Sequence, residues 1–460
     1  MAMHLKELQA FLDTHGIRPN RQLGQCFLVD DNVSRWIVDQ AALEPDDVVV
    51  EVGPGAGALT RHLVGRVRRL ILIEKDAKLA AQLAVRFADE PTVEVLHADA
   101  VEYDVRPLFL EGRVKLIGNL PYSVGNEILR VFLTAPTPVV LAVAMVQREV
   151  ADRICAAPRT KDYGILSLML QERWRPELVK TVGPQLFFPR PEVDSSIVRL
   201  MPRPAGDLAP HSPETFARMV RLGFAQRRKQ LRNNLGIDAA TWEPAVAALG
   251  LPATVRAEEL SLSQWVDLSN LVAPHPAGGH AQSGAEIFDV VDEQDAVTGQ
   301  LTRAEVHRRK LLHRAVHILV FNRLGEVFLQ KRSLLKDTHA GSWDSSSSGH
   351  LDAGEDYATA AVRELEEELC LPPTAPLTRL GKIAAGPGTD MEFVEIYRAE
   401  LGKREIRVHG NEIDSGAFFP VDLVRRWIEQ RPQDFATGFR TVWRYLDERG
   451  GAGAGGVRAF

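Results

Sequence analysis

The sequence contains few cysteines and none of the signals of a secreted or membrane protein. Three cysteines occur in 460 residues (Cys26, Cys155 and Cys370), too few and too scattered for a disulfide framework or a zinc site. No apolar run reaches the roughly 18 residues that a membrane-spanning helix needs. The first residues lack the charged-then-apolar layout of a secretory signal. We therefore expect a cytoplasmic protein with no membrane partner.

The chain also lacks the strong positive charge of many nucleic-acid-binding proteins. Its net charge is −6, so any contact with nucleic acid must rest on local basic patches. Apolar residues make up 45% and charged residues 25%, which is typical of a soluble globular protein. A length of 460 residues predicts two or three domains.

Short apolar runs alternate with helical patterns in the first part of the chain. Such runs are typical of buried strands, and their alternation with helices predicts an α/β fold with a doubly wound, Rossmann-like parallel sheet. The strands are expected at 48–52, 70–74, 93–96, 115–118 and 139–146.

The rest of the chain divides by composition. Phe216, Val220 and Phe224 recur at helical spacing, with no strand-like run nearby, which predicts a small helical subdomain. A strand-like run at 315–321 and a helical pattern at 355–369 indicate a second domain that mixes strands and helices. The expected divisions are a first domain over 1–205, the helical subdomain over 206–272, a Pro- and Gly-rich linker over 273–285, a second domain over 286–449 and a Gly-rich flexible tail over 450–460.

A glycine-rich turn follows the first strand of the sheet, and acids end the next two. Gly53, Gly55 and Gly57 lie between a strand and a helix, where glycine lets a nucleotide-like ligand approach the backbone. Glu74 can accept hydrogen bonds from ribose hydroxyls, and Asp99 can accept one from an adenine amino group. The turn lacks the third glycine spacing of the dinucleotide fingerprint, which favours S-adenosyl-L-methionine as the ligand. The alternative is that the two acids only cap the following helices.

The segment Asn119-Leu120-Pro121-Tyr122 ends the fourth strand and suits the recognition of an exocyclic amino group. Adenine N6 is a poor nucleophile because its lone pair is delocalised into the ring. The Asn119 side-chain oxygen and the Leu120 carbonyl can accept hydrogen bonds from the N6 hydrogens, which favours a tetrahedral nitrogen. Pro121 would fix the loop, and Tyr122 would stack on the base. The alternative is a strand-ending turn with a packed tyrosine.

These residues belong to a series of collinear motifs across residues 17–272. The chain resembles the bacterial small-subunit (16S) ribosomal RNA adenine N6-dimethyltransferases. The matching segments are Arg21–Leu28, Glu51–Thr60, Asn119–Tyr122, Met145–Val150, Tyr163–Ser167, Phe188–Ser195, Arg227–Leu235 and Arg256–Ser261. The resemblance implies dimethylation of two adjacent adenosines in the 3′-terminal hairpin loop of 16S rRNA, in the immature small ribosomal subunit. Bases in a loop are already unstacked, so their presentation costs less than flipping from a duplex.

The resemblance also implies roles for individual residues. The family usually has asparagine where this chain has Cys26, so a side-chain contact to the cofactor would be lost there, whereas a backbone contact would survive. Phe188 is expected to clamp the target base. The expected cofactor contacts are Cys26, Leu28, Gly53, Gly55, Glu74, Asp99 and Asn119.

A basic run in the helical subdomain is the expected RNA contact. The residues are Arg218, Arg221, Arg227, Arg228, Lys229 and Arg232. Such side chains can hold phosphates, although most charge runs are only solvated helix faces. The family resemblance favours the RNA interpretation.

A second motif, from Gly349 to Leu371, fits the Nudix box, G-x5-E-x7-R-E-U-x-E-E-x-G-U with U apolar. Glu364, Glu367 and Glu368 share one helix face, where a divalent cation such as Mg²⁺ or Mn²⁺ would relieve their mutual repulsion. The match implies an α/β/α Nudix hydrolase domain. The alternative is a solvated acidic helix.

Three further residues of this box carry expectations. Arg363 would orient one carboxylate, and Glu355 would hold a metal ligand or a water. Cys370 replaces the last glycine of the box, which we expect to alter the helix exit more than the metal face.

The surroundings of the box resemble a Nudix subgroup related to isopentenyl diphosphate isomerase. The matching residues are Phe288–Glu293, His313–Ile318, Gln330–Ser333, Trp343 and Gly349–His350. The isomerases have cysteine where this chain has Ser348, and the chain keeps the full hydrolase box. We therefore expect metal-assisted hydrolysis of a diphosphate-containing small molecule. The alternative is a ligand sensor without turnover.

Two other functions remain open for the first half. The chain could methylate adenine in large-subunit rRNA, or it could be a ribosome assembly factor in which catalysis is secondary. Tyr163–Ser167 and Arg256–Ser261 favour the small-subunit enzyme, by resemblance.

Overall fold

The structure is a computed structural model that describes residues 5–20, 24–274, 283–372 and 376–449. The chain forms two compact units. The first comprises Met1–Asp207, Gly223–Asn234 and Val255–Leu262, and the second Leu208–Leu222, Leu235–Thr254 and Ser263–Phe460. Most of the expected linker, at 275–282, and the expected tail at 450–460 lie outside the described residues. No helix within the described ranges is long and apolar enough to span a bilayer.

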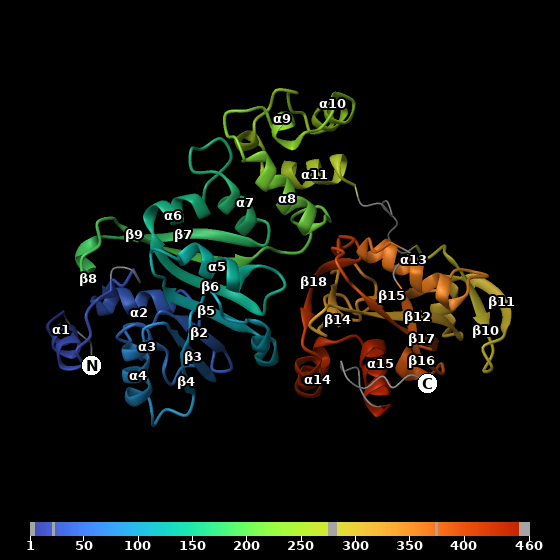
Figure 1. Cartoon of the computed structure of the whole chain (residues 1–460), viewed down its shortest axis with the longest axis horizontal. Helices are drawn as coiled ribbons and strands as arrows, with labels where there is room; N and C mark the ends of the chain where they lie inside the picture. The colour runs from blue at the N-terminus through green and yellow to red at the C-terminus, as the bar shows by residue number, and fades with distance from the viewer. Residues whose placement is uncertain (1–4, 21–23, 275–282, 373–375, 450–460) are drawn as a thin grey trace. The chain divides into compact units, whose positions relative to one another are not determined.

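A seven-stranded sheet forms the centre of the first unit (Figure 1). Its strands are β2 (Val48–Val52), β3 (Arg69–Glu74), β4 (Val93–His97), β5 (Val114–Asn119), β6 (Val139–Gln147), β7 (Trp174–Val182) and β9 (Ser195–Pro202), in the order β4-β3-β2-β5-β6-β9-β7. The strands from β4 to β6 run parallel, which confirms the five predicted strands.

The last two strands of the sheet lie beyond the five predicted parallel strands. β9 pairs antiparallel with both β6 and β7, so the sheet is mixed. β7 forms the edge of the sheet, and most of its residues are not buried. Because an edge strand needs no continuous apolar run, the sequence of β7 does not show the apolar pattern that predicts a buried strand.

Helices pack on both faces of this sheet. Alternate residues of β2 point to opposite faces, so Val48 and Val50 pack with Leu129 of α5, whereas Val49 packs with Ile37 of α2. The helices are α1 (Leu5–Thr14), α2 (Asp31–Asp39), α3 (Thr60–Leu63), α4 (Ala77–Arg86), η1 (Arg106–Glu111), α5 (Gly125–Leu133), α6 (Arg148–Ile154), α7 (Ile165–Gln171) and η2 (Pro184–Leu186). A short ribbon of β1 (Phe27–Leu28) and β8 (Phe187–Phe188) completes the unit.

The stretch between residues 208 and 274, all of which is described, contains helices and no strand, as predicted. Its elements are α8 (Pro213–Gly223), α9 (Leu231–Leu235), α10 (Ala239–Ala248), η3 (Ala257–Glu259) and α11 (Leu262–Val272).

The second unit contains another seven-stranded sheet, in the order β14-β13-β12-β17-β16, with β15 beside β12 and β18 beside β13. Its strands are β12 (His313–Phe321), β13 (Val327–Arg332), β14 (Trp343–Asp344), β15 (Ser347–His350), β16 (Leu377–Ile383), β17 (Glu392–Glu400) and β18 (Ile413–Phe419). A separate hairpin joins β10 (Ile287–Val291) to β11 (Val297–Thr302). The helices are α12 (Arg303–Arg309), α13 (Tyr357–Leu369), η4 (Pro387–Thr389), α14 (Val421–Gln430), η5 (Pro432–Asp434) and α15 (Thr437–Glu448).

Helix α13 matches the predicted helical pattern but begins two residues later. The Asp356 side chain accepts a hydrogen bond from the Thr359 amide and so caps the helix. Leu365 and Leu369 pack against Val316 and Ile318 of β12. Glu364 and Glu368 lie next to this apolar stripe and are also buried.

The exit of α13 generates a stability prediction. Cys370 ends the helix with φ 53° and ψ 33°, a left-handed conformation that costs a residue with a Cβ atom about 1 kcal/mol. Cys370→Gly should therefore raise the Tm of the second unit by about 2–4 °C in calorimetry of the full chain. Cys370→Ala keeps the Cβ atom and should give no gain. A lower Tm for the glycine variant would contradict the assigned backbone strain.

Candidate active sites

One cavity lies at the carboxyl ends of the central strands of the first unit. Parallel strands end at the same edge, so the turns after β2, β3, β4 and β5 meet there. The cavity encloses about 800 Å³ of space that is open to solvent, a size suited to a nucleoside-like ligand. The predicted site residues among its lining are Cys26, Gly53, Gly55, Glu74, Asp99, Asn119, Leu120 and Pro121.

The glycine turn after β2 has the conformation that only glycine adopts readily. Gly53 and Gly55 have φ values of +67° and +57°. A Cβ atom at Gly55 would lie 3.0 Å from the Phe27 ring, so a side chain would also push into β1. The turn therefore leaves its backbone exposed to the cavity.

Glu74 is buried at the end of β3 and is held by backbone amides. Its two carboxylate oxygens accept hydrogen bonds from Gly55 N at 3.0 Å and Asp76 N at 2.9 Å. Burial raises the pKa of Glu74 above its ordinary value. Each oxygen has a second lone pair, so the carboxylate can still accept hydrogen bonds from two ligand hydroxyls.

Asp99 follows β4 on the same edge. Its side chain accepts hydrogen bonds from Lys75 Nζ at 2.6 Å and from Val101 N at 3.0 Å. The Lys75 ammonium group lowers the pKa of Asp99, so this carboxylate is ionised at neutral pH. Glu74 and Asp99 are the acceptors that an adenosine moiety needs, so the cavity fits S-adenosylmethionine.

The Asn119 amide has a fixed orientation. Its Nδ2 donates a hydrogen bond to the Cys26 carbonyl oxygen at 2.9 Å, and only the NH₂ end of the amide can donate there. The Oδ1 atom is thereby left as an acceptor. The contact from Cys26 is a backbone one, so it does not depend on the asparagine that the family usually has at that position.

Three predicted residues lie outside this cavity. Leu28 lines a neighbouring hollow together with Gly53, Gly55 and Asn119. The Tyr122 hydroxyl is hydrogen-bonded to the Ser195 hydroxyl. Phe188 pairs with Phe27 across the ribbon of β8 and β1. Of the motif at 21–28, residues 21–23 lie outside the described part of the chain.

The sequence did not predict that Glu51 is a buried carboxyl group in the wall of this site. Glu51 is 1% exposed and lines the same hollow as Leu28. Burial, with a smaller contribution from the nearby Glu74, raises the pKa of Glu51 to about 8, although hydrogen bonds from Thr60 oppose the shift. An acid inside an apolar strand of the sequence is the signal that could have identified it.

The predicted RNA-binding residues differ in what they contact. Arg227 forms an ion pair with Glu258 and donates to the carbonyl oxygens of Lys161 and Tyr163. Arg228 and Lys229 are exposed in the turn between α8 and α9. Arg218 and Arg221 are exposed on α8, and Arg232 is half-buried on α9.

The second unit holds an acidic cavity on helix α13. Arg363 stands among the carboxylates: its Nη1 lies 2.9 Å from both Glu364 Oε1 and Glu367 Oε2, and its Nε lies 3.1 Å from Glu355 Oε1. Glu368 accepts hydrogen bonds from Ser348 N at 3.1 Å and from Gln330 Nε2 at 3.3 Å. The cavity is lined by Glu286, Phe288, His350, Asp352, Arg363, Glu364, Glu367, Glu368, His409 and Glu412.

These carboxylates fit a divalent cation. A Cβ atom at Gly349 would lie 1.9 Å from Glu364 Oε1, so the first glycine of the box leaves room for this carboxylate. Burial, followed by repulsion from Glu368 and Glu367, raises the pKa of Glu364 to about 8, although Arg363 opposes the shift. A cation would hold Glu364 in its ionised form. Glu412 and His409 line the same cavity and were not foreseen from the sequence.

Two known families match this chain. Residues 16–273 match the family described as ribosomal RNA adenine dimethylase. The chain belongs to this family. Residues 311–437 match the NUDIX domain. The chain is therefore an enzyme of an S-adenosylmethionine-dependent methyltransferase family that carries a Nudix hydrolase domain.

The chain is similar to several named proteins. Ribosomal RNA small subunit methyltransferase A of Geobacillus kaustophilus is 36% identical over 275 residues, which cover 57% of this chain and 94% of the relative. The protein of the same name from Ralstonia nicotianae is 42% identical over 270 residues, with coverages of 57% and 94%. The crystal structure of the 23S rRNA methyltransferase ErmE has 31% identity and a TM-score of 0.45, and covers 54% of this chain and 99% of that chain.

The burial of Glu51 generates a prediction about pH. Its folded-state pKa of about 8 lies above the ordinary 4.5, so between these values the folded state holds a proton that the unfolded state has lost. The stability of the first unit should therefore fall as pH rises through this window, by on the order of 3–5 kcal/mol. Glu51→Gln removes the titrating group. The Tm of this variant minus the Tm of the wild type should therefore increase from pH 5 to pH 8.

Exposed Glu90 provides the matched control for this experiment. Thermal unfolding of Glu90→Gln should follow the wild type at every pH. Parallel Tm curves for the wild type and Glu51→Gln would show that Glu51 does not titrate in this window.

Proposed function

We propose that the methyltransferase part dimethylates N6 of two adjacent adenosines in the 3′-terminal hairpin loop of 16S rRNA. The substrate would be an immature small ribosomal subunit in the cytoplasm. The relatives named ribosomal RNA small subunit methyltransferase A support this target, at 36% and 42% identity. The observation that carries the proposal is the Asn119 amide, whose Nδ2 is held by the Cys26 carbonyl so that Oδ1 remains an acceptor.

The cofactor would supply the methyl group. Gly53 and Gly55 would let it lie against the backbone, Glu74 would accept its ribose hydroxyls, and Asp99 would accept its adenine amino group. Leu28 and the Cys26 backbone would contact its remaining parts. All of these residues line the cavity or the adjoining hollow.

The target adenine would be held beside this cavity. Asn119 Oδ1 and the Leu120 carbonyl would accept hydrogen bonds from the N6 hydrogens and draw the nitrogen lone pair out of the ring. Pro121 would fix the loop, while Tyr122 and Phe188 would hold the flat faces of the base. This is catalysis by position and hydrogen bonding, and it needs no strong general base.

The RNA backbone would be held by basic residues of α8, α9 and the turn between them. Arg221, Arg228, Lys229 and Arg232 would contact phosphates. Arg227 would contribute less, because its guanidinium already contacts Glu258 and two carbonyl groups.

We also propose that the chain is organised into functional parts with boundaries after residues 205, 272, 285 and 449. These parts are the methyltransferase domain, the helical RNA-binding subdomain, the linker, the Nudix domain and the tail.

We propose that the Nudix domain hydrolyses a diphosphate-containing small molecule with Mg²⁺ or Mn²⁺. Glu364, Glu367 and Glu368 would hold the cation, which would activate a water. Arg363 and Glu355 would orient the carboxylates. The domain would be a hydrolytic member of the subgroup related to isopentenyl diphosphate isomerase, since Ser348 replaces the isomerase cysteine and contributes only its backbone amide to Glu368.

The methyltransferase proposal predicts opposite outcomes at the two partners of one hydrogen bond. Asn119→Ala removes the acceptor for N6 and should lower methyl transfer to undermethylated small subunits by at least about 100-fold. Cys26→Ala keeps the backbone carbonyl and should lower methyl transfer by less than tenfold. Incorporation of label from S-adenosylmethionine measures both.

Two results would contradict the proposal. If Asn119→Ala retains methylation, the Asn119 amide has no essential role in the reaction. If this variant loses methylation but still restores subunit assembly in cells, the assembly-factor function is the better account.

The hydrolase proposal is tested by two glutamates on the same helix. Glu367→Gln removes a proposed metal ligand and should lower phosphate release from a panel of nucleoside and isoprenoid diphosphates at least about 100-fold. Glu366 is exposed on the same helix, so Glu366→Gln should behave as the wild type. Equal phosphate release by all three chains would exclude the metal assignment, and no phosphate release by any of them would favour a ligand sensor without turnover.

A further inference from the structure

The side chain of Tyr122 is anchored to the interior of the first sheet. Its hydroxyl group is hydrogen-bonded to the hydroxyl group of Ser195, which begins β9. Ser195 is 0% exposed, and it pairs with Gln147 of β6 on one side and with Val182 of β7 on the other. Tyr122 itself lies in the loop between β5 and α5. The hydrogen bond therefore ties a loop residue to a point of the sheet that has strands on both sides.

The main chain around Tyr122 is fixed as well. Leu120 N donates a hydrogen bond to the Met145 carbonyl oxygen of β6 at 2.9 Å. A Cβ atom at Gly24 would lie 3.1 Å from Tyr122 N, so the segment before β1 packs closely against this loop. Rotation about the side-chain torsions would still move the half-buried Tyr122 ring if its hydroxyl end were not held too. Ser195 supplies this second anchor.

The loop that carries Phe188 ends at the same point of the sheet. Phe188 is the last residue of β8, and residues 189–194 lead from it to Ser195. The carbonyl oxygen of Asp194, the residue before Ser195, accepts a hydrogen bond from Arg148 N at 2.9 Å. The start of β9 is thus a common fixed point for the two aromatic residues that are proposed to hold the target base.

The two methyl transfers place different demands on these contacts. Unmodified adenine has two N6 hydrogens for the two proposed acceptors, Asn119 Oδ1 and the Leu120 carbonyl. After the first transfer one hydrogen is left, so the base loses one of the two hydrogen bonds that orient it. Contacts with its flat faces must then keep the N6 lone pair aligned, because a small displacement of reacting atoms slows a transfer strongly. The second transfer therefore depends more on the Tyr122 ring than the first does.

We propose that Ser195 is a positioning residue for the second methyl transfer, because it holds Tyr122 against the base when one N6 hydrogen bond has been lost. In this step the N6 lone pair forms a bond to the methyl carbon, the carbon–sulfur bond breaks with its electrons left on sulfur, and the last N6 proton passes to water. Ser195 lies outside the lining of the cavity and acts only through Tyr122. This role rests on the proposed dimethylation of adenine.

The test compares two adjacent serines of β9 in the full chain. Ser196 is also 0% exposed, and its hydroxyl group is hydrogen-bonded to that of Thr181 at 3.0 Å, so Ser196→Ala removes an equivalent hydrogen bond. Each chain methylates undermethylated small subunits with S-adenosylmethionine, and mass spectrometry measures the ratio of N6-methyladenosine to N6-dimethyladenosine. Comparison at equal total incorporation removes the effect of a slower enzyme. Ser195→Ala should raise this ratio about fivefold or more, whereas Ser196→Ala should leave it as in the wild type.

Tyr122→Phe tests the other partner of the hydrogen bond. This variant keeps the ring and loses the hydroxyl group, so it should raise the ratio as Ser195→Ala does. The double variant should raise the ratio no further, because both changes remove the same hydrogen bond. If circular dichroism shows that Ser195→Ala does not fold, the ratio measured for Tyr122→Phe decides.

Two results would overturn this role alone. One is an unchanged ratio in Ser195→Ala or Tyr122→Phe beside a wild type that dimethylates adenosine. The other is a double variant whose ratio rises by the product of the two single effects, since independent effects would show that the two hydroxyl groups do not act through one hydrogen bond. A wild type that transfers no methyl group would overturn the proposed function itself, and this role with it.

Discussion

The methyltransferase site depends on where one amide points. The hydrogen bond from Asn119 Nδ2 to the Cys26 carbonyl joins the end of β5 to the segment before β1 and determines which end of the amide can donate. Without it, the amide could rotate and present NH₂ to a substrate amino group, which needs an acceptor. The protein thus selects the acceptor through its backbone, so the identity of residue 26 matters less than the path of the chain there.

The buried carboxylates of the two catalytic units differ in whether a cationic side chain contacts them. In the first, Glu51 and Glu74 are buried, no cationic side chain of the described residues is among their hydrogen-bond partners, and burial raises both pKa values. In the second, Arg363 reaches three carboxylates and still leaves Glu364 with a raised pKa. The first arrangement suits a ligand that offers hydroxyls. The second suits a ligand that brings positive charge, as a divalent cation does.

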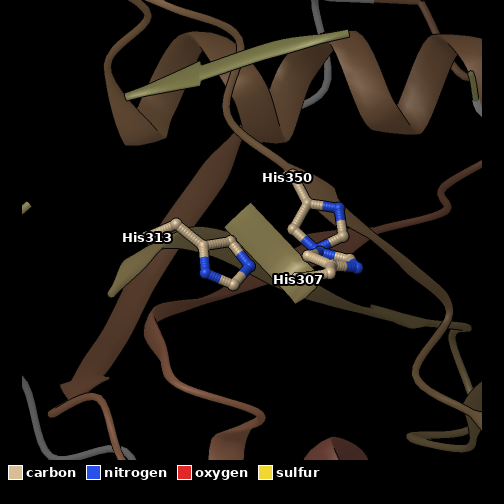
Figure 2. A group of neighbouring side chains, drawn as sticks. All are labelled: His307, His313 and His350. Carbon is tan, nitrogen blue, oxygen red and sulfur yellow. The ribbon is translucent and has the colours of Figure 1, made fainter. Parts of the chain in front are cut away.

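The parts of the structure that follow from local patterns were predictable from the sequence. The five parallel strands are buried apolar runs, and the glutamates of α13 are spaced to share a helix face. Strand β7 was missed because an edge strand needs no apolar run. The contacts of Arg227 with Glu258 and Lys161 were missed because they join distant residues. The proximity of His307, His313 and His350, which have ring nitrogens within 4.8 Å of one another (Figure 2), was missed for the same reason, since three separate elements bring these residues together.

The central claim is that the chain methylates adenine N6 in small-subunit rRNA. The most direct measurement incubates the full chain and S-adenosylmethionine with small subunits from a strain that lacks this modification, and with free large-subunit rRNA. Mass spectrometry of RNA fragments then locates the modified nucleosides. The account predicts N6-dimethyladenosine at two adjacent positions of the 3′-terminal hairpin loop of the small-subunit rRNA. Dimethyladenosine in the large-subunit rRNA alone would contradict it.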